Sequence, residues 1–179
     1  MSFAEAMPTL NEGDHTLGPL SASLLIMTYG NYPCPHTGKA HQSVKHLRES
    51  LGDKLCFIFR HFPTLHSYPQ SQLTAETAEA AGNQGKFWEM HNKLFDNQQA
   101  LDDASLVEYA DELGLDIPQF LQELADHVHA PHIQNDVESG IQYGVASTPT
   151  FFIGIRHEGT ENLESFVQQI LNIKATSGS

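Results

Sequence analysis

The chain has 179 residues, enough for one domain with a sizeable core, and its 22 acidic against nine basic side chains give a formal net charge of −13. Nucleic acids and anionic membranes are bound chiefly through Lys and Arg, so this composition argues against both as partners. Residues 1–8 lack the basic and apolar regions of a secretory signal, no run is long enough to span a membrane, and two cysteines suit a reducing compartment, which together predict a cytoplasmic protein.

The first clear element is an apolar run at 23–29, which predicts a buried strand. Apolar residues at helical spacing follow from residue 35 onward, so Cys34 is predicted to lie at a strand-to-helix turn. Pro35 suits the first helical position, where its missing N–H costs nothing. The unpaired amides and the positive dipole end of a helix start favour a thiolate over a thiol. Cys34 is therefore the candidate nucleophile.

Two neighbours of Cys34 are candidates for tuning its chemistry. His36 adds positive charge when it is protonated, and Thr37 offers a hydroxyl donor to the sulfur. The spacing from Cys34 to Thr37 is that of a Cys-X-X-Cys redox turn whose second sulfur is replaced. A single thiol forms only mixed disulfides, glutathione adducts or a sulfenic acid. The alternative, an inert buried cysteine, fits poorly with a position between two prolines.

A helix is predicted over 35–51, ending at Gly52, and the apolar segment 55–59 reads as a central parallel strand, which makes a βαβ unit. A helix of this length spans about 25 Å, so the second strand starts at the end of the sheet opposite to Cys34. Cys56 is then out of disulfide reach of Cys34 and is predicted to be a core residue. The same strand returns His61 towards Cys34. His61 is a candidate neighbour of the thiol, with a turn histidine bonded to backbone as the alternative.

Residues 66–144 read as helical almost throughout. Ser71 is predicted to cap the first of these helices. Asp116 and Gln119 have the spacing of a reciprocal cap at the start of a later one.

Three histidines, His127, His129 and His132, cluster near the end of this helical stretch. Paired metal ligands on a helix lie four residues apart on one face, and Pro131 interrupts this segment. We therefore predict solvent-exposed histidines and no metal site.

The segment after the helices predicts a strand at 150–153, with Pro149 at its entry, where no ladder N–H is needed. A brief last strand is predicted at 155–158, followed by a helix from Gly159 with a continuous apolar stripe. Whether Pro149 is cis, or an ordinary trans proline at a strand entry, is left open by the residues alone.

Four segments resemble the DsbA-like branch of the thioredoxin superfamily: Tyr-Gly-Asn-Tyr-Pro-Cys-Pro-His-Thr at 29–37, Phe-Arg-His-Phe-Pro at 59–63, the helical segment 85–95, and Thr148-Pro149. The resemblance covers most of the chain. It implies an α/β, thioredoxin-like fold with a helical insertion between the βαβ unit and a C-terminal ββα unit. We expect one DsbA-like domain over 1–179, with 66–144 as the insertion. The resemblance also implies a cis Pro149 that faces Cys34 and forms a peptide-binding wall with Thr148.

The implied activity is thiol–disulfide oxidoreduction, and the departure at Thr37, where the family usually has cysteine, changes its form. We expect Cys34 to act as a monothiol that attacks protein or glutathione disulfides, with glutathione as co-substrate and no bound cofactor. The expected catalytic residues are Cys34, His36 and Thr37. The expected substrate-binding residues are Tyr32, Pro33, His61, Thr148 and Pro149.

Two other functions are compatible with the same sequence. Kappa-type glutathione transferases and related isomerases use a serine or cysteine at this helix start to orient glutathione. Alternatively, the fold is a redox-inactive peptide-binding module that uses the surface of Tyr32, Pro33 and Thr148. A laboratory exchange of a second cysteine for Thr37 would give the same sequence, and the oligomeric state is left open.

Overall fold

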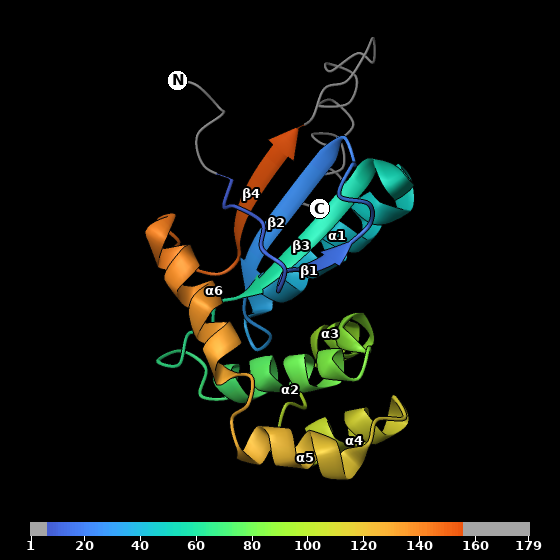
Figure 1. Ribbon diagram of the computed structural model, residues 1–179, viewed down its shortest axis with the longest axis vertical. Coiled ribbons are helices and arrows are strands. Elements are labelled where there is room, and N and C mark those ends of the chain that lie inside the picture. The colour runs from blue at the N-terminus through green and yellow to red at the C-terminus, as the bar shows by residue number, and fades with distance from the viewer. Residues whose placement is uncertain (1–6, 156–179) are drawn as a thin grey trace. The chain divides into compact units, whose positions relative to one another are not determined.

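The computed structural model describes residues 7–155, whose elements are drawn in Figure 1. The strands are β1 (His15–Leu17), β2 (Leu24–Gly30), β3 (Leu55–His61) and β4 (Thr150–Ile155). The helices are α1 (Pro35–Leu51), α2 (Ser71–Asn83), α3 (Phe87–Asp96), α4 (Asp103–Glu112), α5 (Ile117–Ala125) and α6 (Ala130–Gln142), with a 3₁₀ turn η1 (Gly52–Lys54) between α1 and β3. The predicted α/β class is confirmed. The last strand and final helix predicted beyond residue 155 lie outside the described residues.

The four strands form one sheet in the order β1-β3-β2-β4. The edge strand β1 pairs antiparallel with β3, with His15 opposite Phe59 and Leu17 opposite Phe57. The neighbours β2 and β3 are connected through α1, as predicted, and all seven residues of each are buried. Strands covered on both faces need apolar side chains at successive positions, which is the pattern that the sequence shows.

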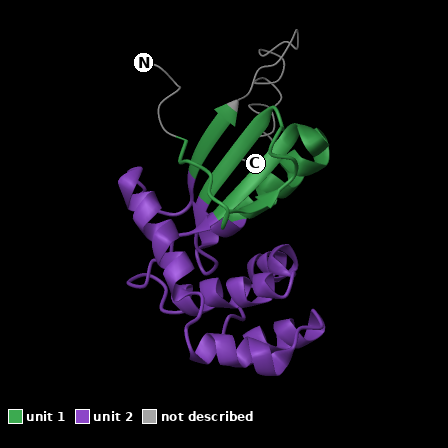
Figure 2. Ribbon diagram, viewed as in Figure 1, with its two compact units in different colours: residues 1–28, 39–59, 151–179 green, residues 29–38, 60–150 purple. Residues whose placement is uncertain are grey.

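The chain forms two compact units, coloured separately in Figure 2. Unit 1 comprises residues 1–28, 39–59 and 151–179; unit 2 comprises residues 29–38 and 60–150. In unit 1, Arg48 of α1 donates to the Leu17 carbonyl of β1 at 2.5 Å. The predicted division into one domain with an insertion at 66–144 stays a prediction.

Unit 2 holds the helices α2 to α6 together with the end of β2 and the start of α1. Helix α2 contacts each of α3, α4, α5 and α6. Its buried positions include Ala75, Ala78 and Ala81, whose small side chains allow neighbouring helices to approach closely. Within residues 7–155, no helix is both long and apolar enough to cross a membrane.

Two predicted helix caps differ from the structure. The Asp116 side chain accepts from the Gln119 amide at 2.9 Å, as predicted, but the Asp116 amide donates to the Gln84 side-chain oxygen at 2.7 Å and not to Gln119. The predicted cap by Ser71 is wrong, because Gln70 occupies the cap position of α2 and Ser71 is its first helical residue. In both cases a residue that sequence spacing did not single out takes the position.

Candidate active site

The centre of the site is the turn between β2 and α1, which lies wholly in unit 2. Cys34 directly precedes α1; its amide donates to the Asn31 carbonyl at 3.1 Å and its carbonyl accepts from the Gly38 amide at 3.0 Å. Cys34 therefore stands at the N-cap of α1, where the first amides of the helix lack intrahelical partners. Pro35 as the first helical residue makes this start independent of a donor there.

The Cys34 sulfur is surrounded by hydrogen-bond donors. Burial by itself raises the pKa of the thiol, but hydrogen bonds from the Thr148 and Thr37 side chains and from the Thr37 and His36 amides together lower it by more, so the net pKa is below its ordinary value. Donors of this kind bond to a thiolate more strongly than to a thiol. The surroundings of Cys34 thus favour its nucleophilic form.

Thr148, the residue before Pro149, lies next to this sulfur. The Cys34 thiol donates to the Thr148 carbonyl at 3.5 Å, across 114 positions of sequence. The Thr148–Pro149 peptide bond is cis. The structure therefore brings Cys34, Thr37 and Thr148 together in one site.

Thr37 occupies the place where a Cys-X-X-Cys turn has its second sulfur. Its side chain is buried, and besides its bond to Cys34 its hydroxyl accepts from the Asn31 amide at 3.4 Å. One hydroxyl thus joins the loop before Cys34 to the sulfur itself.

Gln98, in the connection between α3 and α4, is a site residue that the sequence did not indicate. Its side-chain amide donates to the Tyr32 carbonyl at 2.6 Å and to the Cys34 carbonyl at 2.9 Å. A Cβ on Gly38 would lie 2.3 Å from the Gln98 side-chain oxygen, so glycine at position 38 leaves room for the Gln98 side chain. A glycine at the fourth position of a helix was the only sequence signal for a side chain packed there.

Tyr68 is a second residue that sequence reasoning missed. It lies in the connection 62–70 between β3 and α2. Desolvation, the charge of Cys34 and hydrogen bonding to Cys34 raise the pKa of the Tyr68 hydroxyl, in that order of size. Thr64 in the same connection accepts from the Asn31 side chain at 2.8 Å, which ties this segment to the active-site turn.

The remaining predicted site residues are placed as follows. His36 contributes its backbone amide to the sulfur, while its side chain is exposed, and Pro33 is half-buried. Tyr32 is buried, with its hydroxyl 3.1 Å from His91 Nδ1, and burial followed by the charge of Glu79 holds its pKa well above the usual value. The roles in catalysis and substrate binding that the sequence assigned to these residues stay predictions.

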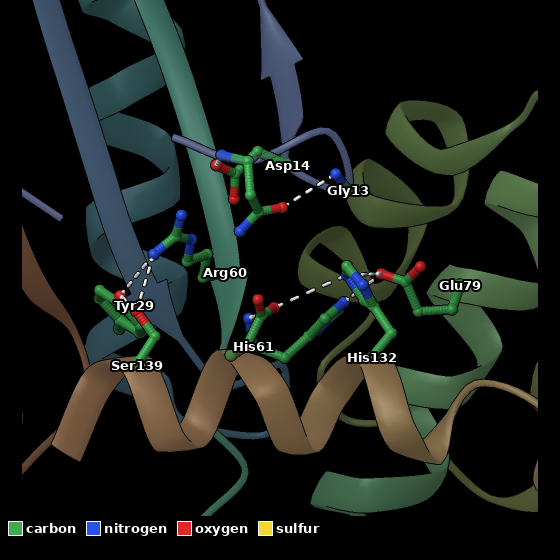
Figure 3. A network of polar contacts seen from close by, with 10 residues as sticks. Gly13, Asp14, Tyr29, Arg60, His61, Glu79, His132 and Ser139 are labelled. Carbon is green, nitrogen blue, oxygen red and sulfur yellow. Dashed lines mark hydrogen bonds and ion pairs between the residues drawn. The ribbon is translucent and has the colours of Figure 1, made fainter. Parts of the chain in front are cut away.

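His61 is buried at the end of β3, and its ring lies 5.9 Å from that of Tyr32 between centroids. His61 Nε2 is 2.6 Å from Glu79 Oε1 (Figure 3). The backbone amide of His61 donates to the Asp136 carboxylate at 2.9 Å. His132 Nε2 lies 3.6 Å from the same Glu79 oxygen. Burial raises the pKa of Asp136 more than the charge of His61 and the bond from its amide lower it. The imidazole of His61 and the carboxylate of Glu79 are thus paired with each other in a buried setting.

Arg60, next to His61 in β3, is a buried cation. Its Nη1 atom donates to the Tyr29 hydroxyl and to Ser139 Oγ, each at 2.9 Å (Figure 3). The buried guanidinium thus ties the end of the strands to α6 within unit 2.

The predicted exposure of the histidine cluster is right for His127 and wrong for the other two. The side chains of His129 and His132 are only 14% and 28% exposed. His129 pairs with the carboxylate of Glu123 at 2.6 Å, and His127 pairs with Glu76 at 3.0 Å. Buried carboxylates on α2 and α5 provide these partners, and sequence spacing did not indicate them.

Known proteins share both the sequence and the fold of this chain. A family model described as Thioredoxin matches residues 10–172. The curated Na(+)/H(+) antiporter NhaA 1 of Salinispora arenicola is 39% identical over 160 residues, which are 89% of this chain and 24% of that protein. The antiporter NhaA of Herminiimonas arsenicoxydans is 36% identical over 146 residues, 82% of this chain and 23% of that protein. The chain thus spans about a quarter of the length of these relatives.

Two solved structures define the fold. The alpha-DsbA1 structure from Wolbachia pipientis has a TM-score of 0.73 at 23% identity, with 94% of each chain covered. The BdbD structure from Bacillus subtilis, in its oxidised form, has a TM-score of 0.69 at 18% identity, with 92% of each chain covered. These likenesses confirm the predicted thioredoxin-like, DsbA-like fold.

Proposed function

This chain belongs to the thioredoxin family, and from that premise we propose that it is a monothiol thiol–disulfide oxidoreductase acting through Cys34. The observation that carries the proposal is the set of donors around the Cys34 sulfur, which lower its pKa against the effect of burial. A stabilised thiolate next to an accessible disulfide is what exchange chemistry needs.

The reaction has two steps. The Cys34 thiolate attacks one sulfur of a substrate disulfide; a Cys34–substrate disulfide forms, and the other substrate sulfur leaves with the electron pair of the broken bond. An external thiolate then attacks the substrate sulfur of this mixed disulfide and releases the Cys34 thiolate. The external thiol is the reductant, so each step exchanges one disulfide for another.

Thr37 supports the monothiol form of this reaction. Its buried hydroxyl occupies the position from which a second cysteine would attack the mixed disulfide, and it donates to the Cys34 sulfur instead. A hydroxyl cannot complete an internal disulfide, so an external thiol must act. We propose glutathione as that thiol and as the source of small disulfide substrates, which places the reaction in a reducing compartment such as the cytoplasm.

Na⁺/H⁺ antiport is named for the curated relatives as whole proteins, and this chain corresponds to about a quarter of their length. The matched residues are largely those covered by the Thioredoxin model. We therefore propose thiol chemistry, and not ion transport, for this segment.

The test is the release of glutathione from a glutathionylated peptide, with reduced glutathione as the external thiol. The protein should accelerate release, Cys34→Ser should reduce it to the uncatalysed rate, and Cys56→Ser should keep at least half of it. Equal rates with and without the native protein would refute the proposal. Persistent activity of Cys34→Ser in a conjugation assay would instead favour a kappa-type transferase.

Thr37→Cys separates monothiol from dithiol chemistry on the same scaffold. When an added oxidant has first joined the restored thiol to Cys34 in a disulfide and has then been removed, the variant should oxidise one equivalent of a reduced dithiol peptide without glutathione and become a dithiol itself, whereas the native chain treated in the same way should not. Catalytic dithiol oxidation by the native chain would contradict the monothiol mechanism.

A further inference from the structure

The turn that carries Cys34 is poor in backbone hydrogen-bond donors. Pro33 and Pro35 have no N–H, so the Cys34 amide is the single backbone donor of residues 33–35, and it donates to the Asn31 carbonyl at 3.1 Å. The carbonyls of Tyr32 and Cys34 each directly precede one of these prolines. The backbone of this stretch therefore depends on donors from elsewhere to hold its carbonyls in place.

Gln98, in the connection 97–102 between α3 and α4, supplies a donor to both carbonyls. Its Nε2 atom lies 2.6 Å from the Tyr32 oxygen and 2.9 Å from the Cys34 oxygen. A side-chain amide nitrogen carries two hydrogens, one for each carbonyl. Because carbonyl oxygens only accept, the amide has its nitrogen and not its oxygen towards them. Gln98 thus joins the backbone before Pro33 to the backbone after the Cys34 Cα atom.

Gly38, in the first turn of α1, completes this arrangement. Its amide donates to the Cys34 carbonyl at 3.0 Å, so this carbonyl accepts one bond from α1 and a second from Gln98. A carbonyl oxygen has two lone pairs, and both are used here. A Cβ at position 38 would lie 2.3 Å from the Gln98 side-chain oxygen, which places the half-buried Gln98 side chain directly against the start of the helix.

We propose that Gln98 is a positioning residue of the exchange reaction, whose side-chain amide fixes the backbone on either side of Cys34. The sulfur is then kept at the start of α1 and next to the Thr148 carbonyl, 3.5 Å away. This inference rests on the proposed thiol–disulfide exchange. Gln98 acts on the reacting sulfur through the backbone, and it neither gives nor takes a proton in the reaction.

Fixing the backbone matters because exchange depends on the direction of attack. The Cys34 thiolate forms the new S–S bond with its electron pair, and the second substrate sulfur leaves with the pair of the broken bond. A nucleophile held in the direction of attack reacts faster than one that moves, and a small misplacement can be costly. A sulfur that moves away from the helix start also loses the amides that favour its thiolate.

Gln84, which caps the end of α2, offers a matched control. Its side-chain oxygen accepts from the Asp116 amide at 2.7 Å, and its nitrogen donates to the Asp116 carbonyl at 3.2 Å. Like Gln98 it is a half-buried glutamine with two bonds to backbone, but it holds the start of α5. Gln84→Ala therefore removes the same kind of contact without altering the Cys34 turn.

The first test is the release of glutathione from a glutathionylated peptide at saturating reduced glutathione. In Gln98→Ala, kcat should fall about tenfold while KM for the peptide stays within twofold of the native value, because the nucleophile and not the substrate is misplaced. Gln98→Met keeps the length of the side chain without its donor and should behave in the same way, so it replaces Gln98→Ala if that variant does not fold. Gln84→Ala should keep the native values.

The second test is the rate of Cys34 alkylation as a function of pH, with all variants carrying Cys56→Ser. In both Gln98 variants the midpoint should lie at higher pH, and the rate below the midpoint should fall about threefold. Gln84→Ala should overlay the native curve although it also loses stability in urea. An unchanged kcat or an unchanged midpoint in the Gln98 variants would overturn the proposal, and so would an equal shift in Gln84→Ala, which would indicate a general loosening of the fold.

The two tests separate this inference from the proposed function. If the native protein does not accelerate glutathione release while the Gln98 variants alone shift the alkylation midpoint, the proposed function is wrong and Gln98 still positions Cys34. If release is catalysed and the Gln98 variants match the native protein in both assays, only the role of Gln98 is wrong.

Discussion

Cys34 and Cys56 are the same residue in two settings, and burial alone does not distinguish them. Their exposed fractions are 4% and 0%, and neither forms a disulfide. Each thiol donates to a backbone carbonyl at 3.5 Å, Cys34 to Thr148 and Cys56 to Gly18. The two cysteines differ in their position in the fold. Cys56 lies inside β3, where backbone amides form the hydrogen bonds between strands. Cys34 precedes α1, whose first amides have no partner within the helix and can donate to the sulfur. Donors, and not exposure, set the reactivity of a thiol here.

The largest expected effect compares the two thiols directly. In single-cysteine variants at neutral pH, Cys34 should be alkylated on the order of a hundredfold faster than Cys56, because the donors at the start of α1 favour the Cys34 thiolate. After denaturation the two rates should become equal. Intact mass spectrometry over time measures the alkylation rates of both cysteines. Equal rates in the folded state would contradict a difference in reactivity between Cys34 and Cys56.

The second test concerns the two hydrogen bonds by which Gln98 holds the turn before α1. Gln98→Ala should cost about 1–3 kcal/mol of unfolding free energy, because two backbone carbonyls lose a donor. Gly38→Ala should destabilise the native chain by displacing Gln98, whose oxygen would lie 2.3 Å from the new Cβ.

The same Gly38→Ala change should become stabilising by about 1 kcal/mol in the Gln98→Ala background, because alanine is the better helix former. Urea denaturation of the four proteins in this double-mutant cycle gives the coupling. Additive effects would mean that position 38 does not make room for Gln98.

The third test removes one donor from the Cys34 sulfur. Thr37→Val keeps the shape of the side chain, but it deprives the sulfur of a hydroxyl and leaves the Asn31 amide without its partner. Alkylation below the midpoint should slow about threefold, and stability should fall by about 1 kcal/mol. Thr37→Ser retains the hydroxyl and should stay close to the native values; equal behaviour of Val and Ser would exclude a role for this hydroxyl.

The smallest expected effect is on stability as a function of pH. The pKa of Cys34 is lowered in the folded protein, so its contribution to stability is fully present above the unfolded value of about 8.5 and is lost as the pH falls through the folded value. The unfolding free energy of the native chain, relative to Cys34→Ser, should therefore rise with pH between these two values. Urea denaturation under reducing conditions measures this difference, and a falling difference would mean that the folded state disfavours the thiolate.

The sequence by itself determined the elements around Cys34 and the chemical character of the residue. The apolar run before the turn, Pro35 and helical spacing up to Gly52 predicted α1 with the bounds that the structure has, because local hydrogen bonds and side-chain periodicity depend on neighbours in sequence. The central β3 and the core position of Cys56 followed from the same kind of pattern.

The tertiary structure alone decided which distant side chains hold the active-site turn and pair with the histidines. Gln98 and Tyr68 carry no motif, and the carboxylates that pair with His61, His129 and His132 are ordinary helical residues in the sequence. Their contacts depend on how α2 to α6 pack, a matter of side-chain shape between segments that are far apart along the chain. A reactive cysteine at a helix start and the donor Thr37 could thus be predicted from the sequence, whereas Gln98 and the carboxylates that pair with the histidines required the folded arrangement.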